Sequence, residues 1–166
     1  MTRASKEVPE SKDIAMYASF YRGIDLLQKD KSTGALAQFE NCKDLDTSFH
    51  VNLFVLQAEM GSGFDKKDYK LFLSAAKANL QTDTTIAIYW ADVASAYACL
   101  YTQNAADSLK QQSLKYYRKA KTMDDTSATA KEFYGRILYR LDSRTIISMS
   151  EFDKKFPKGY TSNNLK

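Results

Sequence analysis

The sequence of 166 residues is poor in the residues that β-rich and disulfide-bonded folds require. It contains 6 glycines, 2 prolines and 2 cysteines. The prolines, Pro9 and Pro157, lie near the two ends, and Gly135 is the single glycine between Asp65 and Phe156. Because sheets need many tight turns, and such turns recruit glycine and proline, this scarcity favours long helices joined by short loops.

Few residues suited to catalysis or metal binding are present either. Cys42 and Cys99 are too few for a disulfide framework, and neither belongs to a C-x-x-C motif. His50, the single histidine, has no second histidine or cysteine at ligand spacing. The carboxylates are scattered, and no pair stands out as a general acid and base. The sequence therefore predicts no catalytic residue, no metal and no cofactor.

Long apolar runs and a concentrated basic face are also missing. No run approaches the ~18–20 residues of a membrane span, and the first residues, MTRASKEVPESKD, lack the apolar segment of a secretory signal. We therefore expect no membrane span and a cytoplasmic protein; the alternative is an exported or periplasmic protein whose signal has been removed. A net charge of +4 is too mild to indicate nucleic-acid binding.

From residue 13 onward, apolar residues recur at helical spacing. Residues 1–12 are predicted to be a disordered lead-in, 13–156 a helical domain and 157–166 a flexible tail. Ser32 and Thr33 suit a helix N-cap, and the GSG stretch at 61–63 is predicted to be a turn. The predicted helices are 13–29, 32–44, 48–61, 66–80, 85–102, 106–122, 127–141 and a short one near 144–155.

Small residues recur with a long period. In every second predicted helix they stand at Gly23, Ala58, Ala94 and Gly135, separated by 35, 36 and 41 residues. In the helices that follow they stand at Cys42, Ala78 and Ala120, separated by 36 and 42 residues. A period just above ~34 residues with two helices in each repeat is typical of a helical solenoid.

Some of the repeated segments match one family pattern at Trp90, Val93, Ala94 and Tyr97 in one first helix, and at Ala35, Phe39, Cys42 and Ser113, Tyr117, Ala120 in two second helices. Through these residues the sequence resembles the tetratricopeptide repeat (TPR) family over roughly residues 16–141. Three departures stand out: Ser19 takes the place of a large aromatic residue, the second repeat fits loosely, and the third has about seven extra residues.

The resemblance implies an all-α, right-handed superhelical stack of about three helical hairpins with C-terminal capping helices. It also implies a non-catalytic adaptor or assembly factor, whose concave groove binds a peptide or helix of another protein. The family's inner-face positions fall on Phe20, Asn52, Glu59, Asp92, Arg136 and Arg140. Arg136 and Arg140 also begin a row with Arg144 that could hold carboxylates of a partner.

Two other functions stay open on the sequence. One is a structural subunit that oligomerises through its outer surface or the ends of the stack. The other is an enzyme whose site is assembled only in space, around Cys42 or His50. Nucleic-acid binding is not expected, because Asp124 and Asp125 interrupt the basic region that precedes them.

Cys42 occupies the position that Ala120 holds in a later repeat, so its thiol is predicted to serve as a small packing group. Cys42→Ala should therefore preserve fold and function. Cys42→Leu should overpack the helix pair and lower the free energy of unfolding by about 1–3 kcal/mol. Urea unfolding of both variants measures this, and a Cys42→Ala protein that folds but loses its function would instead indicate a reactive thiol.

Overall fold

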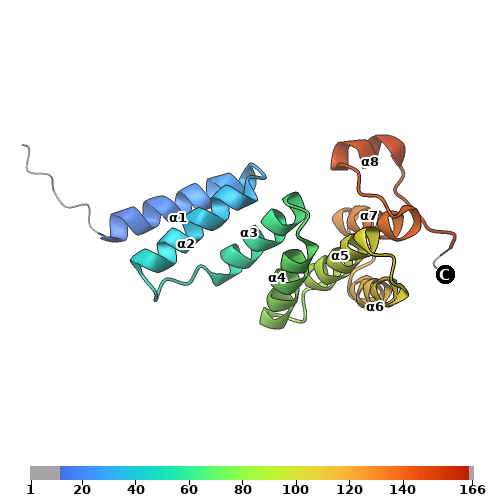
Figure 1. Ribbon diagram of the computed structural model, residues 1–166, viewed down its shortest axis with the longest axis horizontal. Coiled ribbons are helices and arrows are strands. Elements are labelled where there is room, and N and C mark those ends of the chain that lie inside the picture. The colour runs from blue at the N-terminus through green and yellow to red at the C-terminus, as the bar shows by residue number, and fades with distance from the viewer. Residues whose placement is uncertain (1–11, 165–166) are drawn as a thin grey trace, which may run out of the picture. The chain divides into compact units, whose positions relative to one another are not determined.

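The computed structural model describes residues 12–164, apart from the side chains of 128–130, and this part of the chain consists of helices joined by turns and irregular segments, with no strand (Figure 1). Neighbouring helices pack in sequence order, as a fold of repeated hairpins requires. The helices are α1 (Lys12–Gln28), α2 (Ser32–Leu45), α3 (Asn52–Asp65), α4 (Tyr69–Thr82), α5 (Ala87–Gln103), α6 (Asp107–Met123), α7 (Ala128–Ser143) and α8 (Met149–Lys155).

The all-α class and the order of the helices confirm the sequence prediction, but α3 lies about four residues later than predicted. The Asp46 carboxylate accepts hydrogen bonds from the backbone N–H and the hydroxyl of Ser48, at 2.8 and 2.7 Å. This Asx turn holds the chain in a loop, so the helix begins only at Asn52.

The predicted turn at residues 61–63 is wrong, because α3 continues through it to Asp65. Gly61 and Gly63 allow neighbouring residues to approach α3 closely, and they do not bend the chain. A Cβ atom on Gly63 would lie 2.7 Å from the backbone N of Phe72, and one on Gly61 would overlap the Ser32 hydroxyl. The chain instead turns at residues 66–68, and Asp68 caps α4 by accepting a hydrogen bond from the Leu71 N–H at 3.1 Å.

The predicted N-cap at Ser32 and Thr33 is also wrong. Both residues lie inside α2, and Lys31 holds the cap position without a side-chain hydrogen bond. Their hydroxyls face α3 instead: Ser32 packs on Gly61, and Thr33 shares a 2.9 Å hydrogen bond with the buried Ser62. Contacts with α3 therefore engage the two hydroxyl groups that the sequence suggested as caps of α2.

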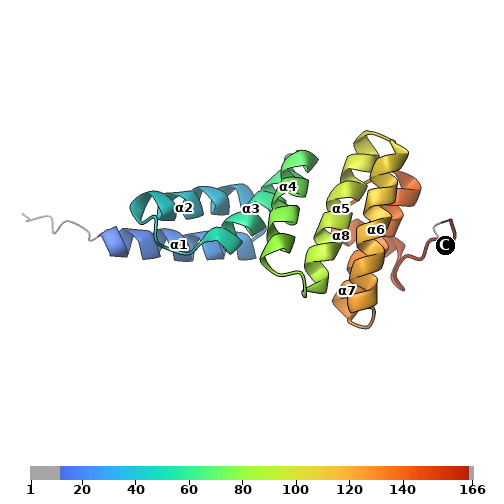
Figure 2. The same ribbon diagram turned by 90° about the horizontal axis from the view of Figure 1, so that it is seen from below.

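The chain divides between Ser62 and Gly63 into two compact units. In the N-terminal unit, α1 and α2 lie side by side along their length (Figures 1 and 2). Phe20 contacts the rings of Phe39, Phe49 and Phe54 at centroid distances of 5.3–6.2 Å. The buried core consists of Met16, Ala35, Phe39, Cys42, Val51, Val55 and Ala58.

In the C-terminal unit, α5 packs against α4, α6 and α7 and is the most buried helix (Figure 2). Its small residues let neighbouring helices approach, and the Ser113 hydroxyl of α6 donates a 2.8 Å hydrogen bond to the Ala94 carbonyl. The core consists of Ala91, Ala94, Ala98, Tyr101, Ala120, Tyr134, Ile137 and Leu141.

The predicted small-residue positions Gly23, Ala58, Ala94 and Gly135 are all buried, as are Cys42 and Ala120. Ala78 is the exception, being only half-buried, whereas Ala76 and Asn79 are buried. The small residue that the sequence pattern indicated for this helix is therefore not one of its buried residues.

The predicted lead-in, residues 1–12, falls outside the described residues except for Lys12, where α1 begins. The predicted tail is described as far as residue 164. Tyr160 contacts α7 by donating a 2.8 Å hydrogen bond to the Asp142 carboxylate. The flexibility predicted for this segment stays a prediction.

Two helical glycines should respond oppositely to alanine. Gly63→Ala should lower the free energy of unfolding by about 1–3 kcal/mol, because backbone atoms of Phe72 and Asp68 lie within 3 Å of the new Cβ and cannot give way. Gly34→Ala should raise it by up to about 1 kcal/mol, because its nearest neighbour, a Leu26 methyl at 3.4 Å, leaves room and alanine favours the helix. Urea unfolding measures both. Equal effects from the two substitutions would contradict the packing described for α3.

Candidate functional site

A groove of about 980 Å³ lies beside α7 in the C-terminal unit. We call it the C-terminal groove. Its walls are the ends of α6 and α7 on one side, and α8 with the segment that follows it on the other. Aromatic residues supply much of the wall: Tyr117, Tyr134, Phe152, Phe156 and Tyr160. This volume falls within the range of about 300–1,000 Å³ that is usual for ligand pockets.

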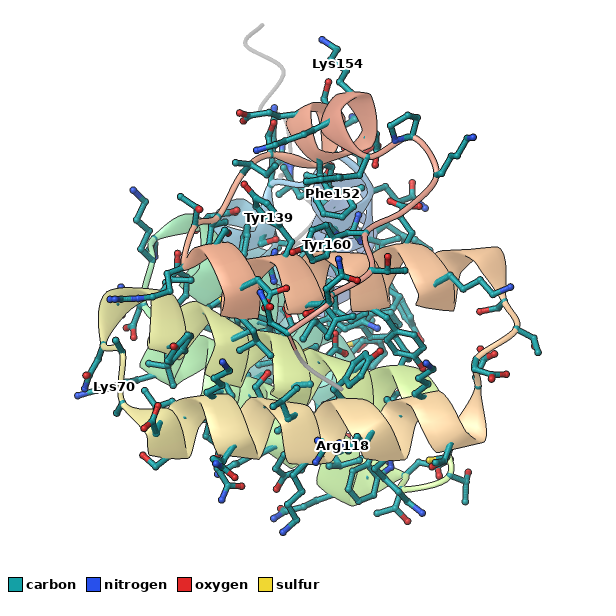
Figure 3. The ribbon with its side chains drawn as sticks, turned by 90° about the vertical axis from the view of Figure 1, so that its right-hand side faces the viewer. Lys70, Arg118, Tyr139, Phe152, Lys154 and Tyr160 are labelled. Carbon is teal, nitrogen blue, oxygen red and sulfur yellow. The ribbon has the colours of Figure 1, made fainter. Side chains whose placement is uncertain are left out.

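Gly135 allows the C-terminal segment to pass close to α7. A Cβ atom there would lie 3.2 Å from the backbone N of Tyr160 and 3.4 Å from its carbonyl oxygen. Tyr139, Phe152 and Tyr160 meet between α7 and α8, whereas Lys154 points away from them (Figure 3). The rings hold α8 and the segment against α7 and so set the shape of the groove.

One wall of the groove is a stretch of backbone without helix or turn, residues 160–162. Its N–H and C=O groups make no hydrogen bond to another described residue. The preceding turn is closed by a hydrogen bond from the Gly159 N–H to the Phe156 carbonyl at 2.8 Å. The stretch thus presents donors and acceptors that a ligand can use.

The tyrosine hydroxyls of the groove are engaged in hydrogen bonds. Tyr134 donates to the Asp124 carbonyl at 2.6 Å, and Tyr160 donates to Asp142. Burial, together with nearby carboxylates, raises the pKa of each phenol to about 12, so both stay neutral at pH 7. The charged residues of the wall are balanced in sign: Lys121, Lys131 and Lys158 against Asp125, Glu132 and Asp153.

Three of the six predicted partner-binding residues lie in α1 and α3. Phe20 is half-buried in the aromatic core of the N-terminal unit, Asn52 is exposed at the start of α3, and Glu59 is half-buried. None of them lines the C-terminal groove, or a second cavity of about 470 Å³ whose wall includes Phe64, Tyr69 and Arg144. Their role in binding stays a prediction.

The other three, Asp92, Arg136 and Arg140, have distinct environments in the C-terminal unit and also lie outside both cavities. Arg136 pairs with the Glu132 carboxylate at 2.7 Å and lies 5.6 Å from the Phe133 ring centroid. Asp92 is half-buried on α5, and burial raises the pKa of its carboxyl to about 7.

Arg140 is buried, with 7% of its surface exposed. Its Nη1 donates a 2.6 Å hydrogen bond to the Ser95 hydroxyl, and its guanidinium carbon lies 5.3 Å from the Phe64 ring centroid. The expected row of three exposed guanidinium groups is therefore not formed. Arg136 forms an ion pair with Glu132, and Arg140 is buried. Arg144 is exposed and lies 5.9 Å from the centroid of the Tyr101 ring.

Cys42 is fully buried in the core of the N-terminal unit, and its Sγ donates a 3.4 Å hydrogen bond to the Met16 carbonyl. Burial raises the pKa of both the Cys42 and the Cys99 thiol, so neither is a ready nucleophile at neutral pH. The predicted packing role of Cys42 is confirmed. His50 is exposed, and within residues 12–164 no three metal-binding side chains cluster.

Across the described range, no helix combines the length and the apolar character needed to cross a membrane. No protein-family model matches the chain, and neither a curated protein nor a solved structure matches it. The resemblance to TPR proteins consequently stays a prediction, and the function has to be argued from the geometry.

The sequence did not predict the C-terminal groove, because most of its outer wall falls in α8 and in the segment predicted to be a flexible tail. One signal was available. Aromatic residues recur every four positions, at Phe152, Phe156 and Tyr160, and continue the spacing across the break at Pro157. A four-residue spacing of aromatic residues that continues beyond the end of a helix indicates that the chain there still packs against another part of the fold.

Asp92 should make stability depend on pH. Its pKa of about 7 in the folded protein exceeds the ordinary value of 3.8, so the folded state binds this proton more tightly than the unfolded chain. The contribution of Asp92 to the free energy of unfolding should therefore fall as the pH rises from about 4 to about 7.

The free energy of unfolding of Asp92→Asn, measured with urea across that pH range, should not contain this contribution. The difference in this free energy between Asp92→Asn and wild type should therefore grow as the pH rises. Asp44→Asn, at an exposed carboxylate of α2, is the matched control and should follow wild type. Identical profiles for wild type and Asp92→Asn would refute the assignment.

Proposed function

We propose that the protein is a non-catalytic interaction module, a divergent TPR-like stack of helical hairpins that binds an extended peptide segment of another protein. The observation that carries the proposal is the C-terminal groove, which joins an aromatic wall to a stretch of backbone without hydrogen-bond partners. The packing of adjacent helices in sequence order supports the repeat architecture. A right-handed superhelical arrangement is part of this proposal.

The groove favours a peptide over a small polar molecule for two reasons. Its volume of about 980 Å³ accommodates several side chains, and its rings offer apolar area at a low entropic cost. The unpaired backbone of residues 160–162 can pair with an extended chain, as sheet edges do when they bind peptides. The balanced charges of the wall select neither an acidic nor a basic partner.

The six inner-face residues predicted from the resemblance are divided between the two compact units, and their role in binding is not part of this proposal. We place the peptide in the C-terminal groove, because none of the six lines this groove or the second cavity.

The alternative of a structural subunit predicts self-association instead. In α1, Tyr17 and Tyr21 are 50% and 66% exposed and lie on one helical face with Ile14. A mass that rises with protein concentration in light scattering would favour that alternative, whereas a constant monomer mass favours the adaptor.

The proposed function is tested by selecting peptides from a displayed random library against the folded protein. We expect recovered peptides to bind Thr161→Ala within about two-fold of wild type. Thr161→Pro should weaken the same peptides at least ten-fold, because proline removes the backbone N–H at position 161. The two variants alter the same exposed side chain, and circular dichroism checks that both retain the helical fold. Peptides that bind Thr161→Pro as tightly as wild type, or no recovered peptide at all, would contradict the proposal.

A further inference from the structure

Arg140 is a buried cation without an anionic partner. The ion pairs of the described residues are Lys29–Asp25 and Arg136–Glu132, so neither includes it. Burying a guanidinium group costs free energy unless an opposite charge compensates it, and arginine is almost never buried without such a partner. The C-terminal unit thus holds a positive charge whose counter-charge is not among the described residues.

Part of the guanidinium group remains open to solvent. It carries five N–H donors, and the contact with Ser95 uses one of its nitrogens, Nη1. Within residues 12–164, no buried side-chain nitrogen or oxygen lacks a hydrogen-bond partner. The nitrogens of Arg140 that have no protein acceptor therefore reach the surface, and this agrees with its exposed fraction of 7%.

The groups around Arg140 are neutral at pH 7. Burial raises the pKa of the Tyr69 phenol and of the Cys99 thiol, and the positive charge of Arg140 opposes the rise in both. Ser95 and Phe64 carry no charge. None of these four residues therefore supplies a negative charge to pair with the guanidinium, and Phe64 offers it only the face of its ring.

A cavity of about 470 Å³ shares a neighbour with this group. Phe64, whose ring centroid lies 5.3 Å from the Arg140 guanidinium carbon, forms part of its wall together with Tyr69, while Arg140 itself does not line the cavity. Arg144, the residue that follows α7, and Lys67 line the cavity with two positive charges, against the single carboxylate of Asp65. The electrostatic environment of this cavity consequently favours an anion.

We propose that an oxyanion, the carboxylate or phosphate group of a ligand, binds to the free N–H groups of Arg140 where they reach the surface near Phe64, with Arg144 of the neighbouring cavity as the second cation. The planar guanidinium fork suits the two oxygens of either group. Ser95 orients the fork from the buried side. The site shares no residue with the C-terminal groove, so either proposal can fail without the other.

The direct test uses the wild-type protein labelled with ¹⁵N at the arginine side chains. Inorganic phosphate and glutarate are titrated separately at constant ionic strength, with sodium chloride as the third arm. The Nε resonance of Arg140, assigned by its absence in Arg140→Lys, should shift saturably with phosphate or with glutarate, and the more effective of the two identifies the source. A resonance that responds to neither, or that responds equally to chloride, overturns the proposal.

A second measurement compares melting temperatures. Arg140→Met keeps the apolar stem and removes the charge, so it should melt no lower than wild type in chloride and lose the anion-induced rise. Arg118→Met, at an exposed position of α6 (Figure 3), is the matched control and should keep that rise.

Ser95→Ala leaves the charge in place and frees Nη1, so it should also keep the rise even if Arg140→Met fails to fold. If wild type and Ser95→Ala show no rise with phosphate or glutarate, Arg140 is a purely structural residue and the proposal is wrong.

Discussion

Close approach of paired helices at small residues is the constraint on which the rest of the structure depends. A Cβ atom on Gly23 would lie 2.5 Å from the ring of Phe39, so α1 can meet α2 at that point only through a glycine. Gly63 plays the same part against Phe72, and Ala94 lies close enough to α6 to accept a hydrogen bond from Ser113. These contacts fix each helix pair and bring aromatic rings into the space beside it.

The helices could be predicted from the sequence because their periodicity and their boundary residues agree. Asp124, for example, lies in the gap between the predicted helices 106–122 and 127–141, and it accepts hydrogen bonds from the N–H groups of Thr126 and Ser127 just after the end of α6. The wrong predictions occurred where a tertiary contact outweighed the local preference of the sequence for a turn or a helix cap. Glycines expected in a turn lie inside α3, and hydroxyls expected to cap α2 pack against α3. The pattern of residue types along the sequence does not show which residue of another helix a given side chain will contact.

The candidate sites were harder to predict for a related reason. The groove depends on Gly135 letting the Tyr160 backbone approach α7, a contact between residues 25 positions apart in the sequence. Arg140 was predicted to face a partner, but Ser95 and Phe64 hold it inside. Both sites include polar groups that have no hydrogen-bond partner among the described residues: the backbone of 160–162 in the groove, and the remaining N–H groups of Arg140. In each case the folded chain presents more donors than it uses, which is the physical basis for proposing ligands there.

The central claim is that the backbone of residues 160–162 pairs with an extended peptide, and amide hydrogen exchange tests it most directly. In the free protein these amides have no partner among the described residues and should exchange rapidly. A saturating peptide selected for binding should slow the exchange of Thr161 at least ten-fold, while amides inside α5 remain unchanged. If the peptide binds with no change in exchange at residues 160–162, this stretch of backbone is not the docking site, and the account of the groove is wrong.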